Sequence, residues 1–495
     1  MTIKRVLLAC RGEIALRFIR TAKRLNIETL SVYTDEERHA SFVLAADQRV
    51  RSDTANPYAS PDALLAIAKN CGVDAIAPGY GPLAENADFA AACRDAGMIF
   101  IGPDPDALLL AGDKVRARDL ARDAGLPVIP GGAVATFEAA MALAEEIGFP
   151  VLLKAVAGGG GRGIRLATGP QDLQAAWKEV DLESRIAFGR SGIYVERYLG
   201  DDIRHVEIQI LADQTGNVLS LGDRGCSVQR RRQKLVEEAP APGIPPSVRH
   251  EISAAATAFA RAASYTSAGT VEFLLDPAGR FYFIEMNGRI QVEHPVTEAI
   301  TGIDIVEQMF RIANGDSLEI VGEEIQRGHA IELRICAEDP YRDFRPGGGI
   351  VSACEFPAGP GVRVDAGIKA GALQPSRYDS LCAKLIIWGR DRTEAIGRAR
   401  QALRETRIAG FPTNLIFHRW LLDQPGFVAG TYDLSIASTF VPDPPSTSLL
   451  RDVAIAAALQ KHLAASAMSS PGPANPASVW RRVNNWGAPN GWQAN

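Results

Sequence analysis

The sequence predicts an α/β fold that begins with a parallel sheet and ends in a strand-rich region. Short apolar segments at 5–9 and 29–33 flank a helical segment at about 13–25, and the same rhythm returns with the segments at 75–76 and 99–101. Strands that alternate with helices form parallel sheets with right-handed crossovers. A dinucleotide-binding fold begins in the same way, but Arg11-Gly12-Glu13-Ile14 lacks the three-glycine phosphate turn of that fold.

The rest of the chain divides into further domains. A helix at about 114–124 leads into a small region at about 130–203, in which a glycine-rich loop lies between two strands. The amphipathic segment 392–405 predicts a core helix. We therefore expect domains at 1–112, 113–330 and 331–446, with a linker or tail at 447–495.

Composition argues against several classes of protein. The 495 residues are 46% hydrophobic, which is enough for several cores, and the net charge of −5 argues against binding of nucleic acid. The basic run Arg230-Arg231-Arg232 is followed by Glu237-Glu238, so we interpret it as the lining of a site. Seven cysteines without a Cys-x-x-Cys pair indicate reduced thiols and no structural zinc. No signal peptide and no membrane-length apolar run is found, so the sequence predicts a cytoplasmic protein outside the membrane.

The segment 285–293 is the most informative part of the chain. Its polar side chains all occupy odd positions, namely Glu285, Asn287, Arg289, Gln291 and Glu293. In an extended chain these side chains share one face. A solvated strand would also alternate, but it would not need acids, amides and a fixed cation together. Nine residues in strand conformation span about 26 Å, so we expect a bend near Gly288 that turns both ends toward one ligand.

A hairpin is predicted just before this segment. Residues 269–275 and 280–285 form its strands, and 276–279 form a four-residue turn. If Leu275 faces Arg280, Glu272 lies opposite Phe283, and Glu285 is a diagonal neighbour of Glu272 at roughly 7–8 Å. With the Asn287 carbonyl, the two acids form a hard oxygen set for Mg²⁺ or Mn²⁺ shared with a polyphosphate. The alternative is two acids exposed on a hairpin.

A second segment predicts an anion site. An apolar strand that contains Lys154 leads into the loop glycines Gly158, Gly159, Gly160 and Gly161. Consecutive glycines let backbone N–H groups approach a phosphate. The loop is not a P-loop, because the lysine precedes the glycines and no Gly-Lys-Ser/Thr follows. A flexible linker is the alternative, although linkers rarely lie between apolar strands and basic residues.

Several motifs together resemble the biotin carboxylase module of biotin-dependent carboxylases, a member of the ATP-grasp superfamily. The resemblance runs in register from about residue 3 to about residue 442. Its motifs are Arg11-Gly12-Glu13-Ile14-Ala15, Pro78-Gly79-Tyr80-Gly81, Gly112-Asp113-Lys114, the glycine loop, Arg204-His205-Val206-Glu207-Ile208-Gln209, Cys226-Ser227-Val228-Gln229-Arg230-Arg231 with Gln233-Lys234, and Arg289-Ile290-Gln291-Val292-Glu293-His294-Pro295. The implied fold is an ATP-grasp with an N-terminal βαβ domain, a glycine-rich lid and a C-terminal strand-rich domain.

The resemblance implies an ATP-dependent ligase in which ATP and bicarbonate form carboxyphosphate, whose CO₂ passes to the ureido nitrogen of biotin. It assigns Glu272, Glu285 and Asn287 to Mg²⁺ or Mn²⁺. It assigns the following residues to ATP: Lys114, Lys154, Gly158, Gly159, Gly160, Gly161, Glu196, Leu199, His205, Gln229, Glu272 and Glu285.

The same resemblance assigns residues to the binding of bicarbonate and biotin. Lys234, Arg289, Gln291 and Val292 match the bicarbonate pocket, where a guanidinium suits a planar anion with three oxygens. Glu293 matches the base that deprotonates bicarbonate, with a pKa tuned by nearby cations. Two further residues match the biotin end of the pocket: Arg334, which would stabilise the biotin enolate, and Tyr80.

Some positions depart from the family pattern, and none of them removes a residue assigned to metal, bicarbonate or proton transfer. Arg232 replaces the usual histidine and has the largest expected effect, because it adds charge beside the nucleotide and bicarbonate sites. The other departures are Cys10, Ala77, Pro82, Ala84, Ala157, Gly225 and Gly347-Gly348. The match at Tyr378-Asp379-Ser380 and Lys384 implies a structural or interfacial role.

The resemblance also implies partners. No Ala-Met-Lys-Met biotinylation motif occurs, so biotin is expected on a biotin carboxyl carrier protein, unless the chain is truncated before a carrier domain. The tail, with Trp480, Trp486 and Trp492, resembles the start of the carrier-linking region of acyl-CoA carboxylase α subunits. A carboxyltransferase subunit is a second expected partner, and a homodimer is expected by analogy.

Two other functions stay open at this point. One is another ATP-grasp ligase, such as a carbamoyl phosphate synthase-like enzyme, although Arg334 and Tyr80 match biotin-side positions. The other is a catalytically weak or silent nucleotide-binding subunit of a carboxylase, which the departures such as Arg232 would favour.

Overall fold

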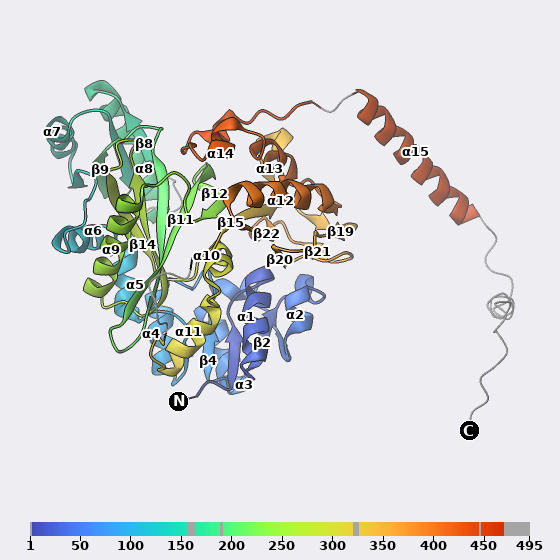
Figure 1. Ribbon diagram of the computed structural model, residues 1–495. Helices are drawn as coiled ribbons and strands as arrows, with labels where there is room; N and C mark the ends of the chain where they lie inside the picture. The colour runs from blue at the N-terminus through green and yellow to red at the C-terminus, as the bar shows by residue number, and fades with distance from the viewer. Residues whose placement is uncertain (1, 156–163, 189–191, 320–325, 445–446, 470–495) are drawn as a thin grey trace. The chain divides into compact units, whose positions relative to one another are not determined.

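The computed structural model describes residues 2–155, 164–188, 192–319, 326–444 and 447–469 (Figure 1). The chain divides into two compact units, Met1–Phe440 and Val441–Asn495. In the second unit, helix α15 (Thr447–Ser469) lies within the region expected to be a linker or tail. Its alanines and leucines are strong helix formers. No helix in the described part of the chain is long and apolar enough to cross a membrane.

The N-terminal sheet is parallel, as predicted, with the strand order β3-β2-β1-β4-β5. Its strands are β1 (Arg5–Leu8), β2 (Glu28–Tyr33), β3 (Gln48–Arg51), β4 (Ala75–Ala77) and β5 (Ile99–Phe100). Its helices are α1 (Gly12–Arg24), α2 (Ser41–Ala45), α3 (Pro61–Cys71), α4 (Ala87–Asp95) and α5 (Pro105–Gly112). Helix α1 buries Ile14, Phe18 and Ile19 in the core, which matches its amphipathic sequence.

Helix α6 (Lys114–Asp123) leads into a small antiparallel sheet at the position of the predicted lid. Its strand order is β6-β9-β7-β8. The elements are β6 (Gly131–Val134), α7 (Phe137–Ile147), β7 (Val151–Ala155), β8 (Ile164–Ala167), α8 (Pro170–Phe188) and β9 (Ile193–Arg197). Gly158, Gly159, Gly160 and Gly161, together with Ala157, lie outside the described residues.

A large antiparallel sheet forms the centre of the first unit, with the strand order β14-β13-β10-β11-β12-β15-β22-β20 (Figure 1). Its strands are β10 (Arg204–Ala212), β11 (Val218–Arg230), β12 (Gln233–Ala239), β13 (Ser267–Leu275), β14 (Phe281–Asn287), β15 (His329–Cys336), β20 (Val362–Ala366) and β22 (Leu381–Gly389). Strands β12 and β15 pair directly. The sheet is therefore continuous across the domain boundary expected at residue 330.

The remaining elements surround this sheet. The helices are α9 (Pro246–Ala262), α10 (His294–Thr301), α11 (Ile305–Asn314), α12 (Arg392–Glu405), α13 (Leu415–Leu421) and α14 (Pro425–Ala429). Short ladders join β16 (Glu338–Asp339) to β17 (Arg345–Pro346), β18 (Gly349–Ile350) to β21 (Leu373–Gln374), and β19 (Ala353–Glu355) to β23 (Arg407–Ala409). Helix α12 has the predicted bounds. All seven cysteines are described, and none forms a disulfide.

The predicted register of the β13–β14 hairpin is wrong. Leu275 pairs with Phe281 rather than with Arg280, and the Asp276 N–H donates to the Arg280 carbonyl, so the pairing is shifted by one residue from the expected register. A bulge then inserts Ile284 into β14, because Glu272 pairs with Glu285 while Phe273 pairs with Phe283. Glu272 and Glu285 are therefore direct cross-strand neighbours rather than diagonal ones.

The core beneath this hairpin is aromatic. The ring centroids of Phe259 and Phe283 lie 4.7 Å apart, and Phe273 packs edge-on against Phe283 at 6.3 Å. All three side chains are fully buried. This packing supports β14, which carries Glu285 and Asn287 of the predicted site.

Replacing Phe283 with alanine is expected to lower the free energy of unfolding by about 3–5 kcal/mol, because it leaves a cavity among the buried rings. Denaturant unfolding would measure the loss. Tyr282→Ala is the matched control, since Tyr282 is only half-buried and its loss should be clearly smaller. Equal losses for the two variants would contradict this account of the core.

Candidate active site

Lys234 is the cation at the centre of the site. Its Nζ lies 2.5 Å from Glu207 Oε2, 2.7 Å from Glu293 Oε1 and 3.0 Å from Glu272 Oε1. These side chains come from β12, β10, β13 and the segment between β14 and α10. One ammonium group, nearly buried, thus holds three buried carboxylates together.

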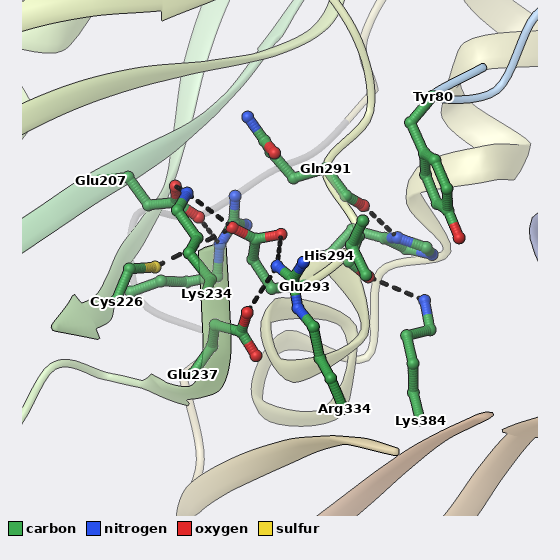
Figure 2. Close-up of polar contacts among 12 residues, drawn as sticks. Tyr80, Glu207, Cys226, Lys234, Glu237, Gln291, Glu293, His294, Arg334 and Lys384 are labelled. Carbon is green, nitrogen blue, oxygen red and sulfur yellow. Dashed lines mark hydrogen bonds and ion pairs between the residues drawn. The ribbon is translucent and has the colours of Figure 1, made fainter. Parts of the chain in front are cut away.

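Both carboxylate oxygens of Glu293 are bound by cations (Figure 2). Lys234 holds Oε1, and Arg334 Nη2 lies 2.9 Å from Oε2. Burial alone raises the pKa of Glu293, but Lys234, Arg334 and Arg224 outweigh burial and hold that pKa well below its usual range. Glu293 is therefore ionised at neutral pH.

Arg334 is shared between two carboxylates. Its Nη2 lies 2.5 Å from Glu237 Oε1 in addition to its contact with Glu293. Burial raises the pKa of Glu237, Arg334 opposes this rise, and Glu293 adds to it. A bulge in β12 explains how Lys234 and Glu237 reach one site. Val228 and Gln229 are adjacent on β11, but they pair with Val236 and Lys234 on β12, so β12 contains one extra residue at this point. The extra residue places positions 234 and 237 on the same face.

A fully buried arginine, Arg224, neutralises one of these acids, Glu207. Arg224 Nε donates to Glu207 Oε1 at 2.5 Å, and its Nη1 donates to Gln209 and Thr297. Glu207 therefore lies between Arg224 and Lys234, and each of its oxygens has a cationic partner. Neither Glu207 nor Arg224 was assigned a role from the sequence. The alternation of His205, Glu207 and Gln209 along β10 is the signal that could have identified Glu207.

His205 connects Glu272 to Gln229. His205 Nε2 lies 2.8 Å from Glu272 Oε2, and the Gln229 amide nitrogen lies 2.6 Å from His205 Nδ1. Asn287 Nδ2 donates to Glu272 Oε1 at 2.9 Å. His205, Gln229 and Asn287 are thus linked to Lys234 through Glu272.

Arg289 is held at the bend that the sequence predicted. Strand β14 ends at Asn287, and Gly288 begins the turn. The Arg289 guanidinium donates to Gln291 Oε1 at 3.0 Å and to Asn287 Oδ1 at 3.2 Å, and its Nε lies 3.3 Å from Glu85. The fork of this arginine is therefore fixed before any ligand arrives.

Three of the described residues predicted to bind nucleotide lie in the lid, namely Lys154, Glu196 and Leu199. Lys154 forms an ion pair with Glu196, and Arg118 Nη1 binds the other oxygen of Glu196 at 3.0 Å. Burial lowers the pKa of Arg232, and the field of Glu196 opposes this effect. Leu199, just after β9, is half-buried.

Lys114 lies apart from the lid residues. Lys114 is the first residue of α6, and its Nζ lies 3.5 Å from Glu285 Oε2. Lys114 and Glu285 form the more exposed edge of the site, since 44% and 33% of their side chains are exposed.

Tyr80 reaches the site through a second buried lysine. Its hydroxyl donates to Glu13 Oε1, which lies 3.2 Å from Lys384 Nζ. Lys384 also donates to the Val292 carbonyl at 2.7 Å. The sequence assigned Lys384 only a structural or interfacial role and gave Glu13 no role. Both were visible within matching motifs, but nothing in the chain order indicated that they meet.

A buried network of alternating acids and cations runs from Glu272 through Lys234, Glu293 and Arg334 to Glu237 on an antiparallel sheet beside a lid, and this arrangement fits an ATP-grasp ligase. The family models agree with this class: "Biotin carboxylase, N-terminal domain" matches residues 2–108, "Carbamoyl-phosphate synthase L chain, ATP binding domain" matches 113–321, and "Biotin carboxylase C-terminal domain" matches 332–439.

The chain belongs to the biotin carboxylase family. It is 45% identical over 449 residues to a biotin carboxylase of Nostoc sp., covering 90% of this chain and 99% of that protein. Biotin carboxylase of Campylobacter jejuni, solved as a β,γ-ATP complex, superposes with a TM-score of 0.85 at 41% identity and covers 88% of this chain and 99% of that one.

A second solved structure is equally similar. It is the biotin carboxylase domain of the Hydrogenobacter thermophilus 2-oxoglutarate carboxylase, in complex with MgADP, ADP and bicarbonate. Its TM-score is 0.85 at 42% identity, and the match covers 88% of this chain and 97% of that one.

Replacing Lys234 with methionine is expected to lower the free energy of unfolding by about 3–5 kcal/mol near pH 8, because three buried carboxylates lose their shared cation. Lys234 helps to hold the pKa of Glu293 below its unfolded value. Without Lys234, only Arg334 and Arg224 oppose the effect of burial, so we expect this pKa to rise and the loss to shrink as the pH falls toward about 5. Denaturant unfolding at both pH values measures this, with the exposed Lys4→Met as control. A loss independent of pH would contradict the prediction.

Proposed function

We propose that this chain carries out the ATP- and bicarbonate-dependent carboxylation of biotin held on a partner protein, as the first half-reaction of an acyl-CoA carboxylase. The observation that carries the proposal is the Glu293 carboxylate held between Lys234 and Arg334. Family membership and the nucleotide and bicarbonate complexes of the two similar structures support it.

Glu293 is the proposed base. Its depressed pKa keeps it in the ionised form, which can accept a proton from bicarbonate. An anion bound beside Lys234 and Arg289 would draw positive charge away from Glu293 and raise its pKa. Bicarbonate binding would therefore strengthen the base that acts on it.

Arg334 is the proposed stabiliser of the biotin enolate. While Glu293 is ionised, the Arg334 guanidinium is shared by Glu293 and Glu237. Once Glu293 has accepted a proton, it no longer neutralises Arg334. The cation then becomes available to a new anion at the moment when biotin is deprotonated, with Tyr80 at the biotin end of the pocket.

A divalent metal fits the residues proposed to hold it. Glu272 and Glu285 are direct cross-strand neighbours, and Asn287 contacts Glu272, so the donors are hard oxygens on one face. When bound there, Mg²⁺ or Mn²⁺ would neutralise charge on the ATP phosphates. The residues proposed to bind the nucleotide are Lys114, Lys154, Gly158, Gly159, Gly160, Gly161, Glu196, Leu199, His205 and Gln229.

The partners follow from the half-reaction. A biotin carrier must present biotin, and a carboxyltransferase must pass the carboxyl group to the acyl-CoA. We also propose the homodimer, the cytosolic location and the division at 112, 330 and 446 that the sequence predicts.

The two alternative functions are weaker. The ATP-binding region matches a model named for carbamoyl phosphate synthase, but the regions on both sides match biotin carboxylase models. A silent subunit would not need the intact network around Lys234, Glu293 and Arg334, and Arg232 leaves that network in place.

ADP release with Mg-ATP and bicarbonate, with and without free biotin, tests the proposed function. Glu293→Gln should lose about 10²- to 10⁴-fold in turnover, because the base is removed. Arg334→Ala should lose about 10²- to 10³-fold, mainly in the biotin-dependent part.

The matched control is Arg392→Met, which removes a cation that binds Glu238 outside the site and should keep most of the activity. Nucleotide binding without bicarbonate-dependent turnover would favour the silent subunit. Repeating the assay with a biotinylated carrier would identify an enzyme that works only with its partner.

Glu285→Gln should raise the Mg²⁺ concentration needed for half-maximal activity by about tenfold or more, because one of the two proposed metal carboxylates is lost. A Mg²⁺ titration at saturating ATP measures this shift. Glu251→Gln, at an exposed position on α9, is the control. An unchanged Mg²⁺ requirement would remove Glu285 from the proposed metal site.

A further inference from the structure

The segment 291–293 carries the proposed bicarbonate pocket, and its carbonyls are bound from one side. His294 Nδ1 lies 2.7 Å from the Gln291 carbonyl, and Lys384 Nζ lies 2.7 Å from the Val292 carbonyl. In Figure 2 both donors lie on one side of the segment, and Lys234 lies on the other. Two successive peptide groups are therefore anchored by buried side chains.

This anchoring fixes the direction of two N–H groups. Neither peptide bond is cis, and in a planar trans peptide the N–H points opposite to the carbonyl. The N–H groups of Val292 and Glu293 are thus directed away from His294 and Lys384. Valine has no polar side-chain atom, so any contact of Val292 with bicarbonate must use its main chain. Successive N–H groups on one side form a concave anion site.

Lys384 is a strong anchor. Its side chain is fully buried. In the sheet, Lys384 on β22 lies opposite Arg334 on β15 and opposite Asp365 on β20. Burial lowers the pKa of Lys384, but Glu13, Glu332 and Asp365 raise it, with a net upward shift. The lysine is therefore charged, and a charged donor makes a stronger hydrogen bond than a neutral one.

His294 is a neutral partner of this anchor. Burial lowers its pKa well below the usual value, and the nearby Lys384, Arg17 and Arg363 lower it further. Its Nδ1 faces a carbonyl oxygen, so Nδ1 carries the ring proton. Replacing this histidine would not leave a buried charge without a partner.

We propose that Lys384 is a positioning residue for bicarbonate: together with His294 it turns the peptide groups of 291–293 so that their N–H groups face the anion. The inference rests on the proposed function and extends it to residues that touch no substrate. Lys384 also binds Glu13, which accepts the Tyr80 hydroxyl. One lysine thereby sets both the anion end and the biotin end of the pocket.

The test uses the full chain with two substitutions, Lys384→Met and Glu13→Gln. Lys384→Met alone leaves Glu13 buried without its cation, whereas the double variant removes both charges and is expected to fold. We expect its KM for bicarbonate to rise about 10- to 100-fold, the size of a lost charged hydrogen bond, while its KM for ATP stays within about twofold. Glu13→Gln alone should change the bicarbonate KM much less.

The chain offers a closely matched control. Glu238 binds Arg392 and accepts the Tyr432 hydroxyl, just as Glu13 contacts Lys384 and accepts Tyr80. Arg392→Met with Glu238→Gln therefore removes an equivalent buried pair outside the site, and its bicarbonate KM should be unchanged. His294→Phe tests the second anchor without changing charge, and it should also raise the bicarbonate KM.

The possible outcomes separate the two proposals. A bicarbonate KM within about twofold of the wild-type value in folded Lys384→Met/Glu13→Gln and in His294→Phe would overturn the positioning role. An equal rise in the control pair would do the same. If the wild-type chain shows no turnover even with a biotinylated carrier, the proposed function fails. In that case, binding of ¹³C-bicarbonate in the presence of Mg-ADP is measured by NMR. The affinity for bicarbonate is compared between the wild-type chain, Lys384→Met/Glu13→Gln and the control pair, and it tests the positioning role of Lys384.

Discussion

The site depends on keeping many like charges close together in the interior of the protein. Glu207, Glu272 and Glu293 are buried within reach of one ammonium group, Lys234, and Arg224 and Arg334 balance the remaining charge. Removing any one cation would leave a buried anion, which costs far more than a surface ion pair contributes. The sheet, the bulges and the aromatic core under β14 all hold these groups at fixed positions. The chemistry therefore relies on preorganised charge rather than on movement of single side chains.

Local patterns predicted the elements well. The βαβ rhythm gave the parallel sheet, and the alternating polar residues at 285–293 gave both the acidic strand and its bend at Gly288. The resemblance supplied Lys234, Glu293 and Arg334, which the structure brings into direct contact. The assigned glycines fall at 156–163, outside the described residues.

What the sequence could not predict depends on single extra residues and on distant pairings. A bulge at Ile284 makes Glu272 and Glu285 direct neighbours, and a bulge in β12 puts Lys234 and Glu237 on one face. No local propensity marks these positions, because a bulge is set by the pairing strand. Glu13, Lys384 and Val292 meet only because α1, β22 and the segment after β14 converge. The separation along the chain hides that contact.

The continuous pairing of β12 with β15 has a consequence for dissecting the molecule. Glu237 lies on β12 and Arg334 on β15, so the ion pair between them spans the junction between the two regions. Cutting the chain near residue 330 would expose two long unpaired strand edges, each a template for aggregation. The regions before and after residue 330 therefore depend on each other both for strand pairing and for the neutralisation of buried charge.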